Sequence, residues 1–180
     1  MPPLRPRPLA RLVLPLVPVL GGLGALLGGC SDSGAAPPSG GTVEDLRQAA
    51  QTLAARPEHT ASVVEVQHIL IAHAGADVPG ATRTLEEAEE RAAEVLGRIE
   101  NGEDFGTLVE QFSDDPGRPG IYTMVADLSL KASNPGSMGR QEMVRAFGDV
   151  GWRLEVGKVG VAPHDPAASP YGWHLVKRLR

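Results

Sequence analysis

The chain of 180 residues contains a single cysteine, Cys30, and few aromatic side chains, at 4%. One cysteine excludes an intrachain disulfide. Because Cys30 directly follows the apolar N-terminal segment, the folded part of the chain also lacks a thiol nucleophile. The scarcity of aromatics means that the core must be built mainly from Val, Leu, Ile, Ala and a few Met.

The sequence also lacks the patterns of a metal site and of a serine hydrolase. His68 and His73 lie five residues apart in a segment with strand character, so they face opposite sides of it. His59 and His164 lie in predicted loops, and no cysteine or acidic cluster accompanies them at zinc spacing. No G-x-S-x-G motif is present. We therefore expect neither a metal nor a cofactor.

The first 29 residues have the layout of a secretory signal. Three arginines precede an apolar run at 12–27, which Pro15 and Pro18 interrupt, and two glycines then precede Cys30. The run is too short and too rich in proline for a permanent spanning helix. Small residues directly before a cysteine resemble the lipobox of bacterial lipoproteins. This resemblance implies cleavage before Cys30 and lipidation of its new N-terminus. The alternative is a secretory signal without lipid.

The segment that follows predicts a flexible tether and an acidic exported domain. Residues 30–41 are mostly Ser, Gly, Pro and Ala, which is typical of a flexible linker. Subtracting the three leader arginines from 17 basic residues leaves 14, against 22 acidic ones, a net charge of −8. This balance argues against nucleic acid as a partner. Membrane attachment would therefore come from the lipid and not from a basic patch.

The rest of the chain predicts an α+β domain. Thr42 can cap a short helix within 42–60, which we expect to be peripheral to the main fold. Thr84-Leu85-Glu86-Glu87 fits a capping box, and an apolar stripe follows it up to Gly102. Asp104 can cap a second helix. The order β-α-α-β-α-β-β indicates about four strands with helices packed on them. Expected strands are 63–73, 121–125, 156–162 and 173–179, with one or two helical turns at 140–147.

Four segments in a fixed order then point to a family. They read VQHILIAH (66–73), TRTLEEAEERAAEVLGRIENGEDFGTLVEQFSDD (82–115), MVRAFGDVGWRLEVGKVG (143–160) and SPYGWHLVKRL (169–179). Together they resemble the parvulin family of peptidyl-prolyl cis–trans isomerases. The resemblance implies a parvulin-like domain over 61–180, with an about four-stranded, mostly antiparallel sheet surrounded by helices.

The same resemblance implies a set of catalytic residues. His68 of the first strand and His174 of the last match the family's pair of site histidines, which lie together under the rotating bond. Asp115 falls where some members carry cysteine and many bacterial members carry aspartate, so a non-covalent role near the rotating carbonyl is implied. Ser169 matches a hydroxyl beside the histidine pair. From the residues alone, Asp115 beside Pro116 could equally begin a turn.

The resemblance also implies substrate-binding residues. Met143 and Phe147 match the proline pocket, with Tyr122 and Trp152 as walls and Tyr171 beside the last strand. The plain alternative for Met143 and Phe147, at i and i+4, is core packing on a short helix, and Trp152 also fits a core position.

Two segments depart from the family pattern. The loop at 74–81 has no basic residue, which argues against a requirement for phosphate before proline. The polar segment at about 126–139 has no counterpart in minimal members. We expect it to be an exposed insertion at the rim of the site.

These observations predict an exported, lipid-anchored isomerase of the cell envelope, facing the periplasm. Its partners would be proline-containing unfolded polypeptides, with no cofactor. The alternative is a non-catalytic parvulin-fold chaperone or binding module for unfolded envelope proteins. A third reading is a periplasmic scaffold whose insertion recruits one partner.

Overall fold

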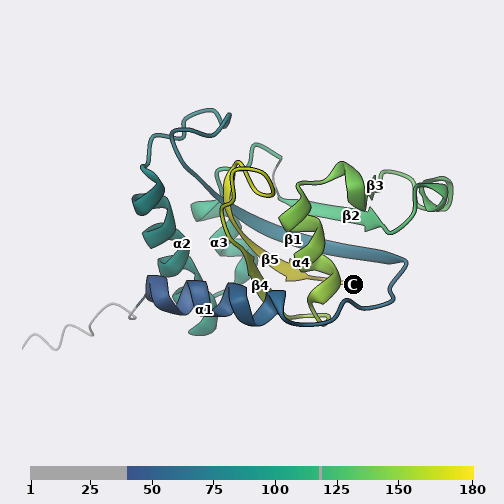
Figure 1. The fold of residues 1–180 in the computed structure, drawn as a ribbon, viewed down its shortest axis with the longest axis horizontal. Coiled ribbons are helices and arrows are strands. Elements are labelled where there is room, and N and C mark those ends of the chain that lie inside the picture. The colour runs from purple at the N-terminus through teal and green to yellow at the C-terminus, as the bar shows by residue number, and fades with distance from the viewer. Residues whose placement is uncertain (1–39, 118) are drawn as a thin grey trace, which may run out of the picture. The chain divides into compact units, whose positions relative to one another are not determined.

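A computed structural model describes residues 40–117 and 119–180 (Figure 1). The predicted signal peptide, the lipidation site Cys30 and most of the predicted tether lie outside these residues and stay predictions. Among the helices of the described part, none is long and apolar enough to span a membrane.

The centre of the fold is a five-stranded sheet with the order β3-β2-β1-β5-β4. All neighbours are antiparallel except β2 and β3. The strands are β1 (Val63–Ala72), β2 (Ile121–Val125), β3 (Met138–Gly139), β4 (Val159–Ala162) and β5 (Gly172–Arg178). The predicted α+β class with a mostly antiparallel sheet is confirmed. The two-residue strand β3 was not predicted, because a pair of residues carries no readable alternation.

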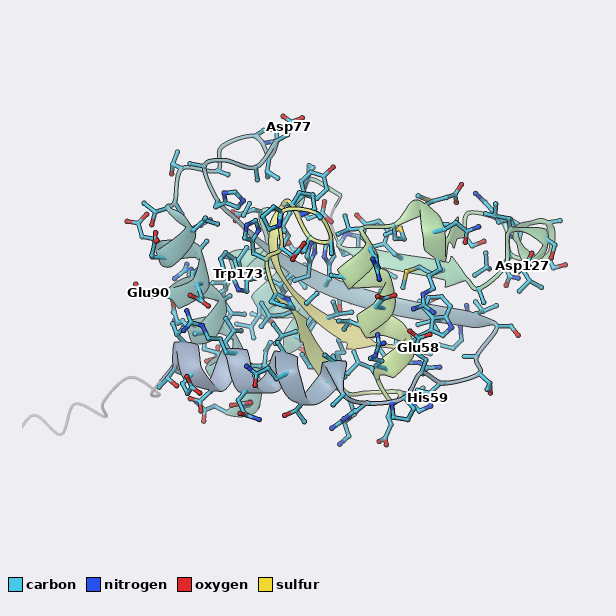
Figure 2. The ribbon with its side chains drawn as sticks, in the orientation of Figure 1. Glu58, His59, Asp77, Glu90, Asp127 and Trp173 are labelled. Carbon is cyan, nitrogen blue, oxygen red and sulfur yellow. The ribbon has the colours of Figure 1, made fainter. Side chains whose placement is uncertain are left out.

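Four α-helices and two short 3-10 helices complete the part of the domain that the structure describes. They are α1 (Val43–Ala54), α2 (Leu85–Glu100), α3 (Phe105–Phe112), η1 (Leu128–Ser133), η2 (Arg140–Glu142) and α4 (Arg145–Arg153). All three predicted caps are present: Thr42 caps α1 and Thr84 caps α2, each in a capping box, and Asp104 accepts from the backbone of Thr107 on α3. Glu90 lies on the outer side of α2, and Asp77 lies at the tip of the loop between β1 and α2 (Figure 2).

Two apolar clusters lie on opposite faces of the sheet. On one face, α2 and α3 pack on Ile69, Ile71 and Leu175. On the other, α4 packs on Val66 and Val176. Exposure along β1 reflects this arrangement. It alternates from Val63 to Gln67, where one face is open, and becomes continuous burial from His68 onward.

Helix α1 is part of the core, so the expectation that it is peripheral was wrong. Leu46 and Ala50 belong to the cluster with α2 and α3, and Leu53 belongs to the cluster with α4. In Figure 1, α1 runs across the base of the domain near β4. The sequence did not indicate this role, because the short apolar stripe of Leu46, Ala50 and Leu53 does not show that it packs into two separate clusters.

The predicted helical turns at 140–147 are divided into two elements. Between η2 and α4, Met143 has extended backbone and Val144 is the non-helical N-cap of α4, which then continues to Arg153. This interruption turns both side chains towards the pocket described below. Arg140 anchors the segment through a bidentate pair with Glu58 and a bond to Asp149.

The segment 126–139, predicted to be an exposed insertion, has its own structure. Asp127 caps η1 by accepting from the Ser129 backbone, and Figure 2 shows Asp127 far from α2. Lys131 pairs with Glu142, and β3 adds to the sheet beside β2. The insertion therefore packs against β2 and η2 and does not loop freely.

Candidate active site

His68 and His174 face the same side of the sheet because of the strand register. His174 on β5 lies directly opposite Leu70 on β1, and His68 is two residues from Leu70. Residues two apart on a strand share a face, as do residues directly opposite. The two Nδ1 atoms are 3.1 Å apart, and the rings stack with an interplanar angle of 14°. Both histidines are buried.

Asp115 completes this group from the turn after α3. Its Oδ2 lies 2.6 Å from His68 Nε2 and accepts from the Tyr122 hydroxyl at 2.8 Å, while its Oδ1 accepts from the Gly117 backbone. The hydrogen bond with His68 is the main cause that holds the pKa of Asp115 well below its usual range, against the opposing effect of burial. Asp115 is therefore an ionised carboxylate with donors on both oxygens.

The ionised carboxylate determines where the protons of the neighbouring groups lie. A carboxylate only accepts, so Tyr122 and His68 Nε2 must both donate to it. When His68 is neutral, its Nδ1 is left as an acceptor, and His174 Nδ1 must donate to it. His174 Nε2 then carries no proton, and that buried atom has no hydrogen-bond partner among the described residues.

Burial holds His174 in its neutral form. Desolvation, followed by repulsion from a charged His68, lowers the pKa of His174 to about 3. Burial and the bond to Asp115 raise the pKa of Tyr122 to about 12, so its hydroxyl stays protonated. The Asp115 carboxylate therefore lies at one end of a line of hydrogen bonds that runs through His68 to His174.

A pocket of about 150 Å³ opens over these groups. Its lining residues are His68, Leu70, Asp115, Tyr122, Met143, Val144, Phe147, Tyr171 and His174. The Phe147 ring meets the His68 ring at 4.9 Å and 69°. The pocket has a polar floor and largely apolar walls, which suits a small apolar ring attached to a polar amide.

Met143 and Phe147 both take part in core packing and in the lining of the pocket. Phe147 is buried in the cluster under α4 and also lines the pocket, whereas Met143 is half-buried at its edge. Sequence reasoning did not include Leu70 or Val144. Leu70 was detectable, since it is two residues from His68 on the same strand face. Val144 was not, because the break between η2 and α4 carries no local signal.

The structure does not place Trp152 or Ser169 as expected. Trp152 is absent from the pocket lining: it is 2% exposed in the α4 cluster, and its indole donates to the Ala61 carbonyl. The Ser169 hydroxyl donates to the Gly172 carbonyl at 2.8 Å instead of reaching the histidine pair. Ser169 therefore shapes the entry into β5, and Trp152 is a core residue. The insertion at 126–139 also contributes no lining residue, although Met143 follows it closely.

Larger hollows elsewhere lack comparable chemistry. One of about 450 Å³ is bordered by Arg56, His59 and Lys158, all exposed. Another, of about 350 Å³, lies between α1, α2 and β4. Neither contains a buried, mutually bonded set of ionisable groups. Within residues 40–117 and 119–180, no three His, Cys, Asp or Glu side chains are grouped so as to hold a metal ion.

Comparison with known proteins agrees with this geometry. The chain is 33% identical over 97 residues to the foldase protein PrsA of Geobacillus sp. (strain WCH70), covering 54% of this chain and 30% of the relative. It is 31% identical over 116 residues to the chaperone SurA of Pseudomonas fluorescens, covering 64% and 22%. The chain thus spans less than a third of the length of these curated relatives.

A solved structure shares the fold. The peptidyl-prolyl isomerase ESS1 from Candida albicans superposes with a TM-score of 0.52 at 21% identity, covering 76% of this chain and 74% of that one. The family pattern described as "PPIC-type PPIASE domain" matches residues 51–179, from within α1 to the end of β5. Since that match extends over most of the chain, this protein belongs to the parvulin family of PpiC-type peptidyl-prolyl isomerase domains.

Proposed function

We propose that this protein catalyses cis–trans isomerisation of X–Pro bonds in unfolded polypeptides by a non-covalent route. One observation carries the proposal: an apolar pocket of about 150 Å³ lies directly over the hydrogen-bonded His68, Asp115 and His174. The proline ring would enter between Phe147 and Met143. The amide on its N-terminal side would then lie near the polar floor.

The chemistry requires little beyond such a pocket. Rotation about a peptide bond has a barrier of about 18–20 kcal/mol, and no covalent bond to the substrate must break. A 10⁴-fold acceleration corresponds to roughly 5–6 kcal/mol of preferential binding of the twisted amide. Fixed dipoles and one carboxylate near the rotating carbonyl supply such preference, because they need no reorganisation as the amide twists.

A covalent route is not supported by the pocket. The one cysteine, Cys30, precedes the domain in the sequence. The Asp115 carboxylate already accepts from His68, Tyr122 and Gly117, which lowers its reactivity as a nucleophile. The roles of His68, His174 and Asp115 in this proposal are to orient and stabilise, and those of Met143, Phe147 and Tyr171 are to bind.

We further propose that the clients are secreted or envelope proteins and that Cys30 carries a lipid anchor. The layout of residues 1–30 and the relatives named as a foldase and a chaperone support this. The protein would then face the periplasm from a membrane surface. Metabolic labelling with palmitate tests the anchor: label is expected on the wild type and not on Cys30→Ala. Equal labelling would reject Cys30 as the site.

A second function, holding unfolded segments without useful catalysis, is favoured by exposed apolar side chains. Ile121, Leu128 and Tyr171 are each more than a third exposed. Such groups on a protein surface can contact unfolded clients.

Exchange NMR on a series of X–Pro tetrapeptides separates the two functions. Wild-type protein is expected to accelerate exchange, and Met143→Ala to lower that rate about tenfold or more. Met138→Ala is the matched control, because Met138 lies on β3 outside the pocket lining. No acceleration by the wild type, together with suppression of client aggregation that survives Met143→Ala, would establish the second function instead.

A further inference from the structure

Tyr122 differs from the other wall residues of the pocket because its hydroxyl bonds to the floor. Asp115 Oδ2 accepts from two side chains at once, His68 Nε2 at 2.6 Å and the Tyr122 hydroxyl at 2.8 Å. The only other tyrosine, Tyr171, also lines the pocket but lies outside this hydrogen-bond line. Both tyrosines therefore line the pocket, but only Tyr122 is hydrogen-bonded to Asp115.

The sheet and a glycine turn hold the Tyr122 hydroxyl in place. Tyr122 on β2 is paired with Val66 on β1. Its ring meets the rings of His68 and Phe147 edge-on, with centroids 5.3 and 5.9 Å apart. A Cβ atom on Gly117 would lie 2.8 Å from the hydroxyl oxygen and 3.3 Å from Asp115 Oδ1. The turn after α3 can thus pass close to the Tyr122 hydroxyl and the Asp115 carboxylate only because residue 117 has no side chain.

Few charged groups face Asp115 in the described part of the chain. The titratable groups near it are His68 from β1, Tyr122 from β2 and His174 from β5, while α4 and the segment before it present the apolar Val144 and Phe147. The neighbouring Asp114 is engaged elsewhere, with Arg83 at 2.6 Å. The protonation of Asp115 therefore depends mainly on its burial and its three donors: His68 Nε2 and the Tyr122 hydroxyl on Oδ2, and the Gly117 backbone N–H on Oδ1.

The protonation of Asp115 determines which atom donates in each hydrogen bond along the line from Asp115 through His68 to His174. If Asp115 gained a proton, it could donate to His68 Nε2, and His68 Nδ1 would then donate to His174 Nδ1. The remaining proton of neutral His174 would move to Nε2, a buried atom that has no partner in the described part of the chain. A buried donor without a partner is costly, so an ionised Asp115 and the present direction support each other.

We propose that Tyr122 is a positioning residue: its hydroxyl holds the Asp115 carboxylate against His68 and so fixes the tautomers of both pocket histidines. Its part in catalysis rests on the proposed isomerase function, but its effect on the histidines does not. Removing the hydroxyl leaves Oδ2 with one donor. Asp115 then becomes easier to protonate. The exchange of donor and acceptor roles along the hydrogen bonds to His68 and His174 therefore occurs at higher pH than in the wild type.

Long-range ¹H–¹⁵N NMR of the histidine rings tests this on the full-length protein. The wild type is expected to show a proton on His68 Nε2 and on His174 Nδ1. In Tyr122→Phe, the acid midpoint of these signals should move up by about one pH unit, as expected when a carboxylate loses one hydrogen bond. The acid limb of the isomerisation rate should move with it.

Two further variants make the result decisive. Tyr171→Phe makes the same chemical change in the same pocket and should leave the histidine signals and the acid midpoint in place. Gly117→Ala should shift them as Tyr122→Phe does, by displacing the hydroxyl. Unchanged tautomers and midpoint in a folded Tyr122→Phe would overturn the inference. If the wild type has no isomerase activity, the histidine signals still decide the role of Tyr122.

Discussion

The Nδ1 atoms of His68 and His174, which belong to neighbouring strands, lie 3.1 Å apart in nearly parallel rings. One of the two atoms must donate and the other accept. If both imidazole rings were doubly protonated, their two Nδ1–H groups would point at each other. At least one of the two rings must therefore be neutral, and burial favours the neutral form of His174.

This relationship predicts loss of stability in mild acid. The pKa of His174 is lowered to about 3 in the fold, against an ordinary value of 6.5, so the unfolded chain binds this proton first as the pH falls. Stability is full above pH 6.5 and is lost as the pH falls towards 3. Between pH 7.5 and 5 we expect a loss on the order of 2 kcal/mol in urea unfolding. His174→Phe should reduce this dependence, whereas His59→Gln, at an exposed histidine, should retain it.

Replacing Asp115 by Asn should lower activity more than it lowers stability. The amide keeps an acceptor for His68 but removes the charge. A hydrogen bond to a charged group contributes about 1.5–3 kcal/mol, so we expect a 10- to 100-fold fall in kcat/KM. Asp114→Asn is the matched control, because Asp114 pairs with Arg83 and the Ala72 backbone. A similar fall in kcat/KM for both variants would contradict a special role for Asp115.

Phe147 should matter for stability as well as for binding. It is 2% exposed and packs in the α4 cluster, so Phe147→Ala is expected to cost about 3–5 kcal/mol. Phe147→Leu should cost less and still alter substrate preference. Thermal unfolding and exchange rates measured on the same samples separate the two effects. A Phe147→Ala protein of wild-type stability would show that the ring is not a core residue.

Helix α1 should be required for the stability of the domain. Leu46 is 1% exposed between α1 and α2, so Leu46→Ala is expected to cost about 2–5 kcal/mol in denaturant unfolding. Gln48→Ala, at an exposed position of the same helix, should change stability by less than about 0.5 kcal/mol. Equal effects of the two substitutions would restore the view of α1 as peripheral.

Gly97 should not tolerate alanine, although alanine favours helices. A Cβ at Gly97 in α2 would collide with the backbone of Gly40 and Gly41, where the chain crosses the helix before α1. We expect a loss of about 1–3 kcal/mol instead of the usual gain of up to about 1 kcal/mol. Gly106→Ala in α3 is the comparison, because its Cβ meets only the Asp104 side chain at 3.3 Å. A stabilised Gly97→Ala would show that the crossing can move aside.

Much of the architecture was readable from local patterns. The capping boxes, the apolar stripe of α2 and the strand segments around His68 and His174 depend on neighbours within a few residues. The elements that were misjudged depend on distant ones. The strand β3 exists because β2 offers an edge, and α1 is buried because two clusters meet beneath it.

The candidate site divides in the same way. The sequence by itself determined that the folded part has no thiol and that a histidine lies in each of two strand segments, with an acid after α3. Only the tertiary structure decided which atoms bond: the register sets His174 opposite Leu70, and Asp115 meets both His68 and Tyr122. The tertiary structure also decided that the Ser169 hydroxyl donates to the Gly172 carbonyl and the Trp152 indole to the Ala61 carbonyl. Hydrogen bonds depend on tenths of an ångström and on direction, and strand register and packing set these between residues far apart in the chain.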